Sequence, residues 1–169
     1  MDEEIRTGGG GFKGLMKTFN LTRPGVAATG TGCVLGAFEM AEEKLKEEGV
    51  EVDWEAGPHC QTATQAKLIE LEAQLEAATL TTLRAAWLMD SGKPNNLESA
   101  VCKSKGGDVC REGVQIAVEL LGAMGISHDY MVEKWFRDAR ITDIYEGTGE
   151  INRLITARAL LNYGSADLM

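Results

Sequence analysis

The feature that most constrains this chain is a helical repeat of apolar residues that continues unbroken through 62–90. Steps of three or four residues separate its members, which are Leu68, Leu71, Leu75, Ala78, Thr82, Ala85 and Met89. Such spacing places the side chains on a single face of an α-helix. A half-buried β-strand requires apolar residues at every second position, and the sequence contains no run of that kind. The repeat therefore predicts an all-α fold.

The same pattern, with helix start and stop signals, predicts the remaining elements. Further helices are expected over 24–48, 97–122, 131–137 and 149–162. Pro24 suits the first turn of the first helix, while Asn96 and Thr148 suit the N-cap positions of the third and the last. Glycine, proline and charged residues mark 49–61 as a loop. Helices joined by short connections predict an antiparallel four-helix bundle with an additional short helix.

A glycine run marks the N-terminal boundary of the predicted bundle domain. Residues 1–11 are polar and end in four consecutive glycines, which carry a large backbone entropy penalty when they are ordered. We therefore expect a flexible lead-in over 1–11, a helical bundle domain over 12–163 and a tail over 164–169.

Charge and composition exclude several classes of function. The 169 residues include 17 basic and 26 acidic ones, which gives a net charge of −9 and argues against nucleic acid as the main partner. No apolar run approaches the ~18 residues of a membrane span, so no membrane insertion is expected. The four cysteines form no Cys-x-x-Cys pair, and no set of metal ligands is evident. A cytoplasmic protein with reduced thiols is predicted.

One glycine-rich stretch imitates a nucleotide-binding loop. Gly30, Gly32 and Gly36 lie close together, but such a loop requires a preceding strand, and the helix predicted from Pro24 already includes them. Ala28, Gly32 and Gly36 also recur every fourth residue. We expect this smooth helix face to pack closely against another helix.

A polar segment around Glu146 carries the candidate chemistry. Glu146 lies between Tyr145 and Gly147, just ahead of the last predicted helix. Judged from the residues alone, it is either a carboxylate that favours the positive end of the helix dipole or a functional acid. Both alternatives remain open at this point.

Several motifs in this order resemble the C-terminal part of acyl-CoA dehydrogenases. The first group is Arg137-Asp138-Ala139, Ile144-Tyr145-Glu146-Gly147-Thr148 and Glu150-Ile151-Asn152-Arg153. The second group, upstream, is Gly9-Gly10-Gly11-Phe12-Lys13, Thr22-Arg23-Pro24, Ala85-Ala86-Trp87 and Asp90-Ser91-Gly92. The likeness covers about 8–163, and the Tyr-Glu-Gly-Thr signature is its most specific part.

The resemblance implies an all-helical C-terminal domain, the third of three in that family. It implies dehydrogenation of an acyl-CoA thioester between Cα and Cβ in a larger assembly, with FAD as cofactor and an electron-transfer flavoprotein as acceptor. A homo-oligomer or a companion subunit is also implied. Its carried-over residues are Glu146 as the catalytic base, Arg23, Thr22 and Gly147 as acyl-CoA contacts, and Thr148, Gly149 and Glu150 as flavin contacts.

Two departures from the family pattern affect flavin binding. Where relatives carry an Arg-x-Phe-Gly segment, this chain has the acidic stretch 49–59, and an acid facing a diphosphate is repulsive. The family's flavin-binding glutamine corresponds to Glu119, and the following Gly-Gly is Gly122-Ala123. The isolated chain is therefore predicted to bind FAD weakly or not at all. The alternative function is a non-catalytic bundle subunit of the same family that serves assembly.

Overall fold

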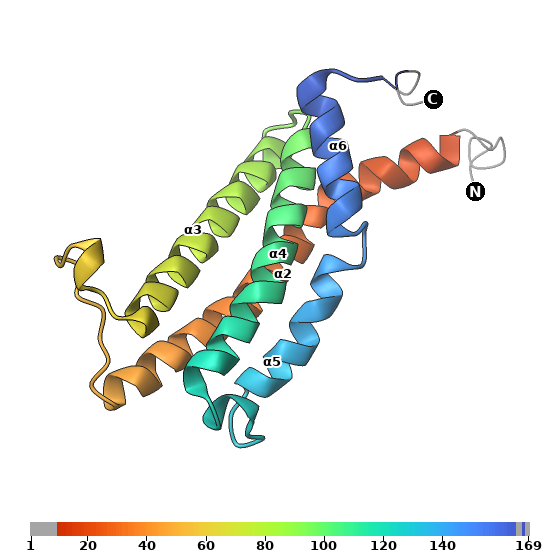
Figure 1. Cartoon of the computed structure of the whole chain (residues 1–169). Coiled ribbons are helices and arrows are strands. Elements are labelled where there is room, and N and C mark those ends of the chain that lie inside the picture. Colours follow the sequence, from red (N-terminus) through yellow and green to blue (C-terminus); the bar gives the residue numbers. More distant parts are fainter. Residues whose placement is uncertain (1–9, 165–166, 168–169) are drawn as a thin grey trace.

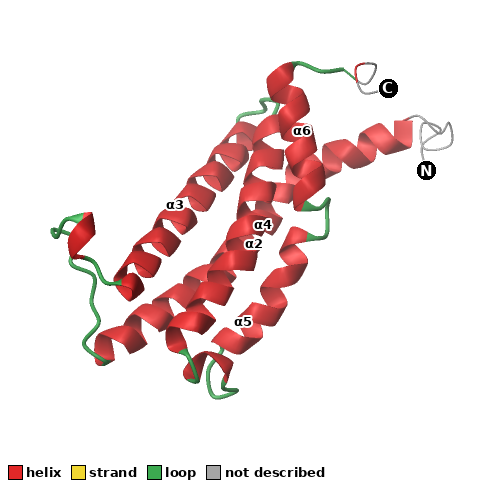
Figure 2. Ribbon diagram, viewed as in Figure 1, coloured by secondary structure: helices red, strands yellow, loops and turns green. Residues whose placement is uncertain are grey.

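The computed structural model describes residues 10–164 and 167, and throughout this part of the chain it contains helices and no strand (Figure 2). Its elements are α2 (Gly10–Glu47), η1 (Pro58–Cys60), α3 (Ala63–Asp90), α4 (Asn96–Leu121), η2 (Met124–Ile126), α5 (Val132–Asp138), η3 (Ala139–Asp143) and α6 (Gly149–Leu161). The predicted all-α bundle, with α5 as its additional short helix, is confirmed.

The long helix α4 is the centre of the bundle (Figure 1). It packs against α2 and α3 along its length, and against α5, η3 and α6 on its remaining side. Helix α6 lies alongside the first half of α4 (Figure 1). Because of this arrangement, α2, α4 and α6 converge on one region, where the turn 144–149 lies.

The core consists of the apolar faces that the periodicity predicted. On α3, all predicted members of the face except Met89 are buried. On α2 the buried members include Val34, Phe38, Ala41 and Leu45. Helix α4 contributes Val109, Val114, Ala117 and Leu121 to the same cluster. Helix-period spacing therefore located both the elements and the sides that they bury.

Helix α2 begins earlier than predicted, at Gly10, so that Pro24 lies in its interior rather than in its first turn. A proline has no N–H, so it leaves the carbonyl four residues before it without its helical partner. That carbonyl belongs to Asn20, and the Asn95 amide Nδ2 donates to it over 2.9 Å. Of the expected lead-in, Gly10 and Gly11 belong to α2, and residues 1–9 lie outside the described residues.

Two helix starts also differ in detail from the prediction. Asn95, not Asn96, is the residue that precedes α4, and its side chain bridges to α2 instead of capping its own helix. Thr62 caps α3 through a reciprocal pair of hydrogen bonds with Gln65. Thr148 precedes α6 as predicted, without a side-chain cap.

The glycine-rich stretch is continuous helix, which excludes the nucleotide loop. The predicted smooth face is correct for Gly36, where a Cβ would lie 3.0 Å from the Trp135 ring. It is wrong for Ala28 and Gly32, which instead line an apolar groove of about 580 Å³ between α2 and α3.

The described part of the chain contains neither a membrane-spanning helix nor a cluster of metal ligands. None of its helices combines the length and the apolar character that a membrane crossing requires. Among the same residues, no cluster of three or more His, Cys, Asp or Glu side chains is arranged to hold a metal ion.

Candidate active site

The turn between η3 and α6 has an unusual backbone. Glu146 has φ +59° and Gly147 has φ +98°, both in the left-handed region. For a residue other than glycine this conformation costs about 1–3 kcal/mol and persists only where the surroundings impose it. At Gly147 a Cβ would also lie 3.3 Å from the Asn152 amide nitrogen. The local structure therefore requires glycine after Glu146.

Three buried side chains from three helices impose this backbone. Arg23 of α2 donates from Nε to the Glu146 carbonyl over 3.2 Å. Lys103 of α4 donates to the Gly147 carbonyl over 3.1 Å, and Asn152 of α6 donates to the same oxygen over 2.7 Å. We call Arg23, Lys103 and Asn152 the turn clamp; none is more than 2% exposed.

Arg23 is itself held from two sides. Its Nη1 donates to Asn20 Oδ1 over 3.2 Å, and its guanidinium carbon lies 5.6 Å from the centre of the Phe19 ring. Burial lowers the pKa of Arg23, and the nearby Glu146 carboxylate counteracts that effect. The guanidinium is therefore fixed beside the turn.

The Glu146 side chain is placed differently from a helix-dipole partner. Its Oε2 is buried and accepts no hydrogen bond from any described residue. The dipole position is filled by Glu150 in the first turn of α6, whose pKa is lowered by bonds from its own backbone N–H and from Thr148. A buried carboxylate oxygen without a partner is rare in proteins and available to accept a proton from another molecule.

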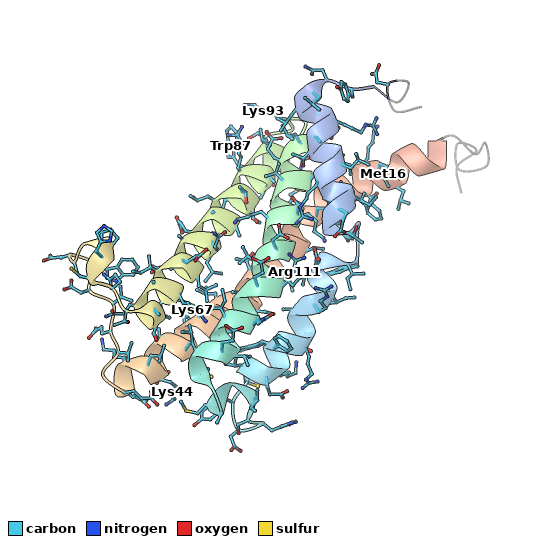
Figure 3. All side chains as sticks on the ribbon, in the orientation of Figure 1. Met16, Lys44, Lys67, Trp87, Lys93 and Arg111 are labelled. Atoms are coloured by element: carbon cyan, nitrogen blue, oxygen red, sulfur yellow. The ribbon has the colours of Figure 1, made fainter. Side chains whose placement is uncertain are left out.

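Two further acceptor atoms near the turn lack a partner among the described residues. They are Asp143 Oδ1 and Asn152 Oδ1. Asp143 is 6% exposed and lies against Gly149, where a Cβ would approach its Oδ1 to 2.8 Å. Its other oxygen lies 3.7 Å from Nη1 of Arg111, which extends from the middle of α4 (Figure 3).

The structure brings most of the predicted site residues together. Gly147, Thr148 and Gly149 are contiguous with Glu146, and Arg23 reaches the turn although 123 positions separate it from Glu146. Thr22 is exposed on α2, with its hydroxyl donating to the Thr18 carbonyl. Sequence reasoning missed Lys103, Asn152 and Asp143.

Glu119 does not join this group. It lies sixteen residues beyond Lys103 on α4, which corresponds to about 24 Å along a helix. It forms an ion pair of 3.0 Å with Lys67 of α3 and accepts from Gln115, and both bonds lower its pKa. This glutamate is engaged within the bundle.

The loop 49–61 offers no matching site for a diphosphate. The Glu51, Asp53 and Glu55 side chains are exposed acids. The neighbouring cation, Lys46, is bound to Glu51 over 2.6 Å. These residues repel rather than hold a phosphate group, so the described loop does not fit the diphosphate of FAD.

Comparisons with known proteins identify the family of this chain. The sequence profile of the acyl-CoA dehydrogenase C-terminal domain matches residues 9–161. The mitochondrial short-chain specific acyl-CoA dehydrogenase of Mus musculus is 36% identical over 153 residues, which cover 90% of this chain and 36% of the relative. Cyclohexane-1-carbonyl-CoA dehydrogenase of Syntrophus aciditrophicus is 35% identical over 89% of this chain and 38% of its own length.

Solved structures give the same result. Butyryl-CoA dehydrogenase of Megasphaera elsdenii superposes with a TM-score of 0.79 at 36% identity, covering 90% of this chain and 39% of the other. A chain in a structure of an electron transferring flavoprotein of Acidaminococcus fermentans matches with the same TM-score at 35% identity, over 90% of this chain and 39% of that one. The chain spans only 36–41% of the length of the curated relatives. It belongs to the acyl-CoA dehydrogenase family and carries the family's C-terminal helical domain.

Proposed function

We propose that Glu146 is the catalytic base of an acyl-CoA dehydrogenase and removes the α-proton of an acyl-CoA thioester. The observation that supports this most is the buried, unpartnered Oε2 on a backbone that the turn clamp fixes. The complete enzyme would dehydrogenate the substrate between Cα and Cβ. In that enzyme, Glu146 takes the proton and, by the family likeness, its backbone N–H donates to the thioester oxygen as negative charge develops there.

The acyl-CoA contacts that we propose are divided between two roles. Thr22 and Gly147 remain candidates for direct contact, because Thr22 is exposed and Gly147 adjoins Glu146. Arg23 bonds to the Glu146 carbonyl and is almost fully buried. We therefore propose that Arg23 supports the base, in addition to any contact with the substrate.

For FAD, we propose that only the first turn of α6 contributes from this chain. Thr148, Gly149 and Glu150 adjoin Glu146 and remain the proposed flavin contacts. The loop 49–61 and Glu119 do not fit the diphosphate and adenine end, for the reasons of charge given above. FAD would accept the hydride from Cβ, and parts of the assembly outside this chain would hold most of the FAD. An electron-transfer flavoprotein would be the final electron acceptor.

Exposed apolar side chains support an assembly with further chains or domains. On α3, Leu80, Leu83 and Trp87 are each 56–60% exposed. The Lys93 ammonium lies over the Trp87 ring, 4.8 Å from its centre (Figure 3). We propose a homo-oligomer or a complex with a companion subunit, built on a bundle domain over 12–163. Light scattering at micromolar concentration tests this, and a strictly monomeric mass with no recovered partner contradicts it.

The compartment that we propose is the cytoplasm. All four cysteines are free thiols, which is compatible with a reducing environment. Formation of a disulfide in protein isolated from its source, without oxidant, would contradict this assignment.

The function is tested by following the α-proton itself. The chain is combined with the missing family domains, FAD and butyryl-CoA in deuterated water, and deuterium uptake at Cα is measured by mass spectrometry. We expect uptake with the parental chain and with the control Glu43→Gln, an exposed acid on α2, and none above buffer with Glu146→Gln. If the parental assembly forms but shows no uptake, the alternative of a non-catalytic assembly subunit is supported, for which the acidic loop is the favouring observation.

A further inference from the structure

The proposed function uses Lys103 only as one of the three members of the turn clamp, and its buried charge has no part in it yet. Lysine is among the residues that are almost never fully buried unless they are paired. Lys103, in the first third of α4, has 0% exposure. Its ammonium group donates over 3.1 Å to the carbonyl of Gly147, 44 positions further along the chain. A charge in this position requires an explanation.

We propose that Lys103 is a positioning residue, which holds the peptide after Gly147 so that the Glu146 carboxylate stays aimed at the substrate. The proposal rests on the proposed role of Glu146. Lys103 does not contact the substrate in this proposal, and it is not part of the family motifs found in the sequence.

Redundancy of the hydrogen bonds is the first argument. The Gly147 carbonyl already accepts from Asn152 over 2.7 Å, so Lys103 is not needed to satisfy it. A second donor, from a different helix, instead restricts the direction in which the Gly147 carbonyl can point. With donors from α4 and α6 on one oxygen, and Arg23 of α2 on the preceding carbonyl, the turn cannot rotate about a single bond.

Charge is the second argument. Burial lowers the pKa of Lys103, and the carboxylates of Asp143 and, more weakly, Glu146 oppose that effect, while Arg23 adds to it. An ammonium group in such a place costs stability compared with a hydrophobic side chain of similar size. A feature that costs stability and lies against a strained turn is typical of a functional site.

The consequence for catalysis is geometric. The carboxylate direction depends on the dihedral angles of Glu146 and Gly147, and both residues have positive φ. A displacement of about 1 Å in a reacting group costs about 100-fold in rate. We therefore expect Lys103→Met, which keeps the length and removes the charge, to release the turn.

The first experiment uses the full chain alone and needs no activity. Amide hydrogen exchange over 144–149 is compared in the parent, Lys103→Met and the control Lys105→Met. Lys105 lies two residues further on the same helix and bonds to Gln74 of α3 instead. Exchange of the core of α3 corrects for any change in global stability. We expect at least about tenfold faster exchange in the turn for Lys103→Met alone. Equal exchange in the parent and Lys103→Met would overturn the proposal.

The second experiment uses the complete assembly and separates positioning from folding. We expect Lys103→Met to lower kcat about 100-fold with KM changed less than about threefold, and Lys105→Met to change neither. Propylammonium, which replaces the missing atoms of Lys103→Ala, should restore part of kcat, whereas sodium at equal ionic strength should not. Loosened exchange with full kcat in Lys103→Met would contradict the proposal. A parental assembly without α-proton exchange would instead contradict the role of Glu146, and the turn exchange would still decide whether Lys103 holds the turn.

Discussion

The turn 144–149 and the loop 49–61 both connect helices and both carry acidic residues ahead of a helix start, yet they are held in opposite ways. The turn is fixed by buried side chains from α2, α4 and α6. The loop is held by residues at the surface, such as the half-buried Gln65 of α3, whose amide donates to the Glu51 carbonyl over 2.6 Å. An exposed ion pair such as Lys46–Glu51 contributes about 0–1 kcal/mol, whereas a hydrogen bond from a charged group such as Arg23 or Lys103 contributes about 1.5–3 kcal/mol.

The difference indicates where the sequence of this chain is constrained. At the turn, a change in any of three distant helices disturbs the backbone of Glu146. In the loop, the acidic side chains of Glu51, Asp53 and Glu55 are exposed, and the fold tolerates them because they face solvent. The sequence of the loop can therefore change without disturbing the backbone of Glu146.

The largest expected effect is on the carboxylate of the turn. In the complete assembly, Glu146→Gln should reduce the rate of flavin reduction by acyl-CoA about 100- to 10,000-fold, because it removes the base and keeps the shape. Glu51→Gln in the loop should leave the rate unchanged. Stopped-flow absorbance measures both. Parental rates in Glu146→Gln would show that another group removes the proton.

The second prediction uses the cysteines as reporters of the two regions. Burial raises the pKa of the Cys110 thiol to about 11 and that of Cys102 to about 12, whereas Cys60 in the loop is exposed. A rise of about two units in the pKa of a thiol reduces its thiolate fraction about 100-fold at a given pH below both values. At pH 8, iodoacetamide should label Cys60 at least ~100-fold faster than Cys110, as followed by peptide mass spectrometry. Similar rates would mean that the helices behind the turn open readily.

The third prediction compares one glycine in each region. Gly147→Ala places a Cβ at φ +98° and should lower the free energy of unfolding by about 1–3 kcal/mol. Gly57→Ala, with φ −63° and open space around its Cβ position, should change it by less than about 0.5 kcal/mol. Urea unfolding followed by circular dichroism measures the difference. Equal values at the two sites would argue against an imposed turn.

The smallest expected effect concerns flavin affinity. The parental chain alone should bind FAD weakly or not at all in calorimetry. Glu51→Lys with Asp53→Lys should tighten the affinity about 2- to 10-fold, since each exposed charge contributes up to about 1 kcal/mol. The control Glu72→Lys with Glu76→Lys on α3 makes the same change in net charge. Tight, stoichiometric binding by the parental chain would contradict our assignment of the loop.

Periodicity predicted the helices and their buried faces because burial is a local property of each helix in this bundle. The start of α2 was not predicted, since the partner that replaces the Pro24 N–H is an amide on a different helix. Ala28 and Gly32 were predicted to be packed, but a small-residue face looks the same whether a neighbour covers it or not.

In the site, the signature around Glu146 was visible in the sequence, while most of its support was not. A lysine within a helix is usually a solvated residue, and nothing near Lys103 in the sequence shows that its partner lies 44 positions away. The run of small residues around it, with Gly106 and Gly107 both buried, is the one local sign that a polar group could be enclosed there.

The bridge from Asn95 to the Asn20 carbonyl has a consequence for the order of folding. The two residues are 75 positions apart, so the amide arrives only after α3 and α4 have docked. We expect that, until then, the proline interrupts α2 and its two halves behave as separate short helices. We expect the Cα chemical shifts of a peptide of residues 10–47 to indicate helix only after Pro24, and Asn95→Ala to slow refolding of the full chain. Unchanged refolding kinetics would show that α2 forms without this contact.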